Sequence, residues 1–150
     1  MKAKVCHHLF NIPHQYTQLQ FLHRSLKEDE AIPHIDSAEN WQCKYAKEVH
    51  QVHFGASDRQ TTLHNAVVYT TDCTLTFCAL SPSMKHDPPV IWAQLLPVLK
   101  FLKDLKFLKN HPRIQKLFFI SDGPNMQYRG KKNFYLLSTI PFQMGFTAVN

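Results

Sequence analysis

The sequence predicts a single α/β domain, residues 1–150, in which helices pack on a mixed sheet. Two segments, residues 60–70 and 74–80, are rich in Thr, Val, Tyr, Phe and Leu and are separated by a short turn, which is typical of an antiparallel hairpin. Helical patterns alternate with short apolar runs through the rest of the chain. Early antiparallel strands followed by alternating helices and strands favour this fold class.

The composition is that of a globular protein. The chain has 150 residues, of which 44% are hydrophobic and 19% charged, and this suits one domain with one core. No apolar run is long enough to span a membrane, and the first residues lack the apolar centre of a signal peptide. We therefore expect an intracellular protein, in the nucleus or cytoplasm, with no membrane partner. The net charge of +6 favours an acidic partner such as nucleic acid.

An N-terminal extension of about residues 1–30 is predicted to be helical. From Ile12 onward apolar residues recur at helical spacing, and Pro13 suits a first turn, so we predict an amphipathic helix over residues 13–28. Acidic residues follow the last apolar position. Because they oppose the helix dipole, we expect the helix to fray at that end.

The first acid of interest, Asp36, lies near the middle or end of a strand predicted over residues 31–41. Asp36 and Glu39 are three residues apart, so on a continuous strand their side chains point to opposite faces. They can share a metal ion only if the strand ends between them. A short helix is predicted next, over residues 42–53, from the helical spacing of its apolar residues.

A long helix is predicted after the hairpin. Asp87 is suited to the N-cap, and prolines in the first turn confirm a helix start. One face of this helix carries Ile91, Leu95, Val98, Leu102 and Leu105, and another carries Lys100, Lys103, Lys106 and Lys109. We interpret the lysine face as solvated rather than as a nucleic-acid contact.

The most informative segment is residues 116–133. Its apolar run, residues 117–120, predicts a strand buried on both faces, and Asp122 follows at the carboxyl end, where α/β folds bind ligands. Asn125 can cap a helix that runs to Ile140, with Gln127, Tyr128, Arg129, Lys131 and Lys132 in its first turns. A carboxylate beside cations and amides suits a metal ion that faces phosphate. The alternative is that Asp122 only shapes the turn.

The cysteines and histidines indicate little. The four cysteines include no C-x-x-C pair, so we expect no disulfide framework. Cys43, His50, His53 and His64 could meet around zinc, but their spacing fits no standard zinc module. We favour exposed or hydrogen-bonded histidines.

Two phrases of the sequence resemble known blocks. HIDSAENW, residues 34–41, and FFISDGPNMQYRGKKNF, residues 118–134, are similar to the D-F-A-E-N-Y-like and S-D-G-x-x-x-Q-Y/F-[KR]-x-[KR]-x-x-F-like blocks of transposon-derived proteins with a DDE-type integrase or transposase core. A strand with an acid, a hairpin, a helix and a second strand ending in an acid also resembles the plan of the ribonuclease H-like fold. A last strand is predicted over residues 145–150.

The resemblance implies a catalytic and metal role for Asp36 and Asp122. In such cores three carboxylates hold two Mg²⁺ (or Mn²⁺) ions that act on a phosphodiester, and these residues match the first two. Glu39 and Asn40 are secondary candidates. The third acid comes from a helix after the last strand, whereas no Asp or Glu follows Asp122 here. We therefore expect a core truncated before that acid, with the C-terminal helix missing.

Three functions remain open at this point. The first is a transposase-derived domain without full polynucleotidyl transfer, which keeps affinity for Mg²⁺ and for nucleic acid, DNA above all, through Gln127, Tyr128, Arg129, Lys131 and Lys132. The second is an active Mg²⁺-dependent nuclease or recombinase completed by another chain. The third is a non-catalytic interaction domain or gene remnant. A missing helix would uncover an apolar sheet face, and we expect self-association through it.

Overall fold

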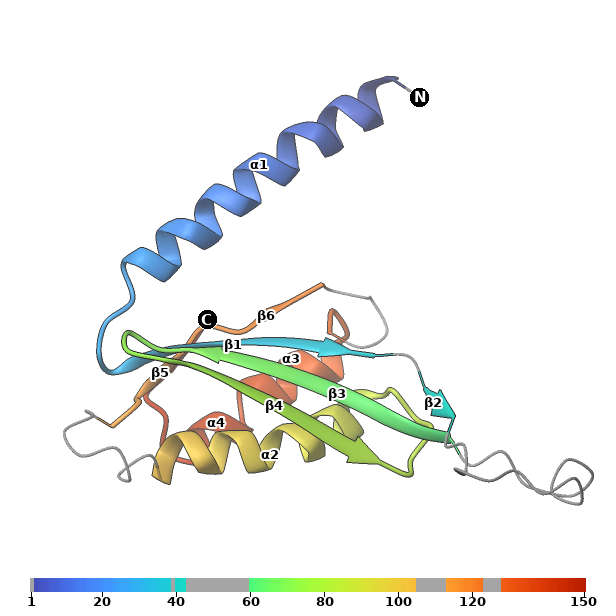
Figure 1. Cartoon of the computed structure of the whole chain (residues 1–150), viewed down its shortest axis with the longest axis vertical. Helices are drawn as coiled ribbons and strands as arrows, with labels where there is room; N and C mark the ends of the chain where they lie inside the picture. Colours follow the sequence, from blue (N-terminus) through green and yellow to red (C-terminus); the bar gives the residue numbers. More distant parts are fainter. Residues whose placement is uncertain (1, 39, 43–59, 105–112, 123–127) are drawn as a thin grey trace, which may run out of the picture.

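A mixed sheet with helices against one face forms the body of the protein (Figure 1). The computed structural model describes residues 2–38, 40–42, 60–104, 113–122 and 128–150. The helices are α1 (Lys2–Arg24), α2 (Pro88–Asp104), α3 (Lys131–Leu137) and α4 (Ile140–Gln143). The strands are β1 (Glu30–Ser37), β2 (Trp41–Gln42), β3 (Gln60–Tyr69), β4 (Thr74–Ser81), β5 (Lys116–Leu117), β6 (Ile120–Ser121) and β7 (Ala148–Val149). The predicted α/β class with a mixed sheet is confirmed.

Strand β1 has an antiparallel neighbour, β3, on one side and the parallel strands β5 and β6 on the other. β3 pairs antiparallel with β1, and β4 pairs antiparallel with β3, which confirms the predicted hairpin. β5 and β6 both pair in parallel with β1, and β7 pairs in parallel with β5. β2 pairs antiparallel with the start of β3. The resulting order is β4-β3-β1-β5-β7.

β5 and β6 are two parts of one interrupted strand, because both keep the same register along β1. Glu30 and Ala31 pair with Lys116 and Leu117, and further along His34 and Ile35 pair with Ile120 and Ser121. Between these ladders, Phe119 donates its N–H to the carbonyl of Asn150, 2.9 Å away. The predicted continuous strand buried on both faces is therefore wrong. Leu117 is buried, but residues 118–120 are half-buried, since helices cover one face only.

The core lies between the sheet and α2. Alternate side chains of β3 point inward, and the predicted apolar face of α2 is buried against them at Ile91, Leu95, Val98 and Leu102. The carbonyl of Asp87 accepts the first helical hydrogen bond, from Ile91, which places Asp87 at the predicted N-cap. Both crossovers, through α2 and through α3 with α4, step in the same direction across the sheet. Right-handed crossovers of this kind place their helices on one face, as Figure 1 shows.

Lys103 corrects the prediction of a solvated lysine face on α2. Its side chain is only 8% exposed, with Nζ 4.1 Å from the ring centre of Phe146 and hydrogen-bonded to the carbonyl of Gly145. Burial lowers the pKa of Lys103, and the charge of Arg113 adds to the effect. Lys100 is exposed as predicted, so the two described lysines of this face differ, one in solvent and one over the turn before β7; Lys106 and Lys109 lie outside the described residues.

Helix α1 stands apart from the sheet (Figure 1). It begins at Lys2, so the predicted start near Pro13 is wrong: the preceding residues include no glycine or proline, and one internal proline removes only one backbone donor. It ends at Arg24, before the acids that oppose its dipole. Its large apolar side chains are exposed, at Val5, Leu9, Phe10, Ile12, Tyr16 and Phe21. No helix in the described part of the chain has the length and apolar character that a membrane crossing requires.

The helix predicted from Asn125 to Ile140 is shorter and divided. α3 begins at Lys131, after Gly130 in an extended conformation (φ −79°, ψ 152°), and Asn125 lies outside the described residues. Pro141 stands in the first turn of α4 instead of ending a helix. The short helix predicted over residues 42–53 also falls outside the described residues, except that residue 42 belongs to β2.

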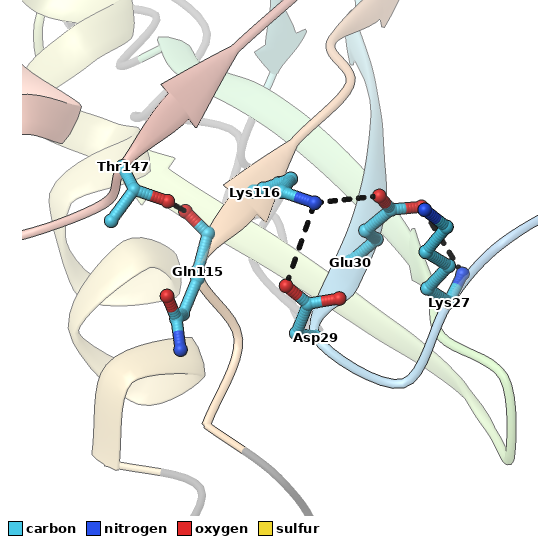
Figure 2. A network of polar contacts seen from close by, with 6 residues as sticks. All are labelled: Lys27, Asp29, Glu30, Gln115, Lys116 and Thr147. Carbon is cyan, nitrogen blue, oxygen red and sulfur yellow. Dashed lines mark hydrogen bonds and ion pairs between the residues drawn. The ribbon is translucent and has the colours of Figure 1, made fainter.

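A charged cluster ties the amino end of β1 to β5 (Figure 2). Lys116 Nζ lies 3.3 Å from Glu30 Oε1 and 3.6 Å from Asp29 Oδ2, while Glu30 Oε2 accepts a hydrogen bond from the Lys27 N–H. These interactions raise the pKa of Lys116, the hydrogen bond to Glu30 most of all. Asp29 and Glu30, which follow α1, thus connect the start of β1 to β5.

The sheet face opposite α2 is open in the described part of the chain, apart from the last turn of α1. There the rings of His23 and Tyr69 meet edge to face, 4.4 Å between centres. The rest of this face is mixed, because Leu63 and Val67 alternate along it with Asn65. Self-association through this face stays a prediction.

Candidate functional site

Asp36 and Asp122 lie level with one another at the carboxyl end of the parallel ladder. His34 of β1 pairs with Ile120 of β6, and Ile35 pairs with Ser121. The next residue after each of these segments is an acid, Asp36 or Asp122. Both acids are exposed. Neighbouring strands are about 5 Å apart, and partners in register point to the same side. β1 also ends at Ser37, between Asp36 and Glu39, which is the condition for those two to share an ion; Glu39 itself lies outside the described residues.

Tyr128 and His64 form a buried pair behind the two acids. The hydroxyl of Tyr128 lies 3.1 Å from His64 Nε2, and the residues are 5% and 2% exposed. Burial lowers the pKa of His64 to about 4, against the opposing effect of Asp36. Burial also raises the pKa of Tyr128, and the charges of Asp122 and Asp36 raise it further. Both acids therefore act on the same buried hydroxyl, which is consistent with their level placement.

A chain of hydrogen bonds holds the segment after Tyr128 against α2. Asn133 Nδ2 donates to the carbonyl of Tyr128 at 2.7 Å, and Asn133 Oδ1 accepts from Trp92 Nε1 at 2.7 Å. Asn133 is buried, whereas its neighbours Lys131 and Lys132 are exposed. The inward residues thus anchor the segment, and its cations remain on the surface.

A second polar group surrounds the end of β1. His86 Nδ1 lies 3.1 Å from Ser37 Oγ, and His86 Nε2 lies 3.0 Å from Asn40 Oδ1. Asn40 Oδ1 also accepts a hydrogen bond from Thr62 Oγ1 at 3.3 Å. Asn40, a secondary candidate in the sequence, therefore connects the end of β1 to β3 and to the segment before α2 by hydrogen bonds.

A cavity of about 410 Å³ adjoins the residues that precede both acids. Ile35 and Ser121 lie in its wall, together with Phe119, Tyr128, Arg129 and Asn150. Most of the wall is apolar, so the cavity suits a flat or apolar group next to a polar rim. Its wall includes Arg129 but neither Asp36 nor Asp122, because successive residues of a strand point to opposite faces of the sheet.

The structure places Asp36 and Asp122 level on neighbouring strands and gives the other predicted site residues different positions. Asp36, Asp122, Arg129, Lys131 and Lys132 are exposed. Tyr128 is in the core, where its ring supports the site from behind and is not available to stack on a base. Gln127 lies outside the described residues, as do the zinc candidates Cys43, His50 and His53. Within the described ranges, no group of three or more His, Cys, Asp or Glu side chains could hold a metal ion.

His86 and Asn133 were not identified as site residues from the sequence, and His64 was considered only as a possible zinc ligand, whereas it is hydrogen-bonded to Tyr128. The sequence contained one signal for His64. It lies at every second position with Thr62, Ala66 and Val68, so all four share the buried face of β3. Its partner Tyr128 is 64 residues away in the chain, so the contact itself has no local signal.

Residues 15–148 match the family described as Domain of unknown function (DUF8701). The chain belongs to this family. The DUF8701 region includes every described residue of the candidate site and omits the first half of α1. No curated protein and no solved structure matches the chain.

Proposed function

We propose that this chain is a ribonuclease H-like, transposase-derived domain that binds nucleic acid through a divalent metal ion on Asp36 and Asp122, without full polynucleotidyl transfer. The register that places Asp36 beside Asp122 carries the proposal. The strand order supports it, because an antiparallel meander of β1, β3 and β4 with parallel strands on the other side of β1 follows the plan of that fold. The sequence blocks around the two acids add the link to transposon-derived proteins.

The acid pair suits one Mg²⁺ or Mn²⁺ ion completed by other oxygen ligands. Mg²⁺ is commonly bound by one or two carboxylates with water and substrate phosphate, and two carboxylates on neighbouring strands of a parallel ladder suit that need. No ion pair to a described cation neutralises either acid. When bound, the ion would bridge the acids to a phosphate of the nucleic acid.

The exposed cations Arg129, Lys131 and Lys132 suit the phosphate backbone. They follow Tyr128, which is fixed through its hydroxyl and its carbonyl. Cations on an anchored segment can meet successive phosphates without reading bases. We therefore expect affinity for DNA that varies little with its sequence and falls steeply with salt.

Metal binding is tested by calorimetric titration of Mg²⁺ and Mn²⁺ into the parent chain and single variants. We expect Asp36→Asn and Asp122→Asn each to weaken binding at least about tenfold. Asp104→Asn, which removes the same charge from the exposed end of α2, should bind like the parent. No binding to the parent at millimolar metal, or an equal loss in Asp104→Asn, would contradict the metal site.

Nucleic-acid binding is tested by the salt dependence of the affinity for a short DNA duplex. A variant with Lys131→Ala and Lys132→Ala should reduce the slope of log K against log salt by about two, because each phosphate contact contributes about 0.9. The control carries Lys85→Ala and Lys100→Ala, two exposed lysines outside this segment, and should keep the parent slope. A parent affinity that is insensitive to salt would contradict this surface.

A further inference from the structure

Strand β4 is an edge strand without the usual protection. It pairs with β3 from Thr74 to Ser81, and no described strand pairs with its other side. Its sequence, TLTFCALS, has no charged residue, proline or glycine. Natural edge strands are commonly short, bulged, covered or charged, because an open edge offers unpaired N–H and C=O groups to another strand. The edge of β4 is thus suited to pairing with a further strand.

An apolar groove runs along this edge, between β4 and α2. It has a volume of about 840 Å³, and its wall includes Phe77, Leu80, Val90, Pro97 and Phe101. Leu80 is 69% exposed and Phe101 45% exposed, so the groove leaves large apolar surface in water. A strand added to β4 would cover this surface as it completes the hydrogen bonds of the edge.

Gln94 of α2 provides a second, independent sign of a missing neighbour. It lines the groove, and its amide nitrogen Nε2 is buried without a hydrogen-bond partner among the described residues. A buried donor without an acceptor is costly and uncommon in folded proteins. A carbonyl oxygen brought into the groove by an added segment would satisfy it.

We propose that β4 pairs antiparallel with β4 of a second copy of this chain, so that two sheets join across a two-fold axis. An added strand must be apolar on the helix side, and β4 itself meets this need with Leu75, Phe77 and Ala79. Because β4 is uncharged, its self-pairing brings no like charges opposite one another. The arrangement also closes, since each copy uses its one β4 edge, and it gives a dimer rather than a fibre.

A two-fold axis perpendicular to the joined sheet fixes which residues can meet. Partners in such a pair point to the same face, so α2 of both copies lies on one side of the sheet. Each groove is then covered by residues of the other copy that lie next to β4. In a pair centred on Cys78, the exposed Cys78 meets its counterpart across the axis, and the exposed Thr76 lies opposite Leu80 of the other copy.

The dimer is tested by sedimentation equilibrium of the full chain over a range of concentrations. We expect the parent to dimerise, and Thr76→Lys to weaken the dimer at least about tenfold, because each lysine then puts a charge on the paired edge opposite an apolar side chain. Gln143→Lys adds the same charge on exposed α4 and should leave the dimer unchanged. Circular dichroism checks that both variants are folded.

Oxidative cross-linking supplies a second readout that does not depend on a destabilising change. In the parent, mild oxidation should link two copies through Cys78, and Cys78→Ser, which keeps the other cysteines, should abolish the linked dimer. A parent that is monomeric at all concentrations would overturn the proposal, even if it captured an extended segment of another protein. A dimer that is unaffected by Thr76→Lys, or still cross-linked in Cys78→Ser, would overturn it equally.

Discussion

The two ends of the parallel ladder formed by β1, β5 and β6 both carry acids, but the acids are in opposite situations. At the amino end, Asp29 and Glu30 lie within 3.6 Å of Lys116, and Glu30 is buried (Figure 2). At the carboxyl end, Asp36 and Asp122 are exposed and have no ion pair with a described cation. Acids at the first end are neutralised by Lys116, whereas those at the second have no ion pair with a described cation and face water.

The difference teaches how to separate structural from functional carboxylates on one strand. A structural acid is expected to lower stability when it is removed, because its cation and its hydrogen-bond donors lose a partner. A functional acid that repels its neighbour is expected to raise stability when it is removed. Three measurements can break or sharpen this comparison.

The largest effect is expected at the carboxyl end, from the pH dependence set by His64. The pKa of His64 is about 4 in the folded chain, whereas its ordinary value is 6.5. Between pH 4 and pH 6.5 the unfolded chain therefore binds more protons than the folded chain. The stabilisation is complete above pH 6.5 and is lost as the pH falls through 4. It amounts to about 3 kcal/mol.

Urea denaturation at several pH values between 7 and about 4 measures this loss. The variant His64→Gln has no group that titrates in this range at that position, and its stability should depend less steeply on pH by the same amount. Equal pH dependence in the parent and in His64→Gln would show that His64 is not held neutral by burial.

A smaller loss is expected at the amino end from Glu30→Gln. The substitution removes the charge that Lys116 and the Lys27 N–H both contact, and it should reduce the free energy of unfolding by about 1 kcal/mol. The matched control is Glu28→Gln, the same change at an exposed neighbour. Equal stability of these two variants in urea would place Glu30 among the acids that the fold does not need.

The smallest effect, of opposite sign, is expected from Asp122→Asn. Relief of the repulsion from Asp36 should raise the free energy of unfolding by about 0.5 kcal/mol at low ionic strength. Salt or Mg²⁺ should reduce the gain, because either one screens or neutralises the pair in the parent. A loss of stability like that expected for Glu30→Gln would remove the distinction between the two ends.

Local patterns predicted those elements whose structure depends on neighbouring residues. The hairpin of β3 and β4 was confirmed because alternation and a turn specify it within about twenty residues. The buried stripe of α2 was confirmed because helical spacing fixes one face. The predicted start of α3 and the predicted exposure of Lys103 were wrong. Gly130 is held by the segment around Tyr128, and Lys103 is held by the turn at Gly145.

The same division applies to the candidate site. The sequence identified Asp36 and Asp122, since each follows an apolar strand that ends in a break of the pattern. It assigned Tyr128 to the surface, because tyrosine within a polar segment has no local sign of burial. The partner that buries its hydroxyl, His64, comes from a different strand.

By itself, the sequence determined the hairpin of β3 and β4, the buried face of α2 and the place of one acid at or near the end of each of two strands, because these properties arise from patterns over a few residues. The tertiary structure alone decided that those acids lie level, that Glu30 is neutralised, and that Tyr128 meets His64. Each of these facts depends on a register or contact between residues more than sixty positions apart, which no local pattern encodes. The physical reason is that the surroundings of a charged side chain in space, and not its neighbours in sequence, decide whether it is paired within the fold or free to contact a ligand.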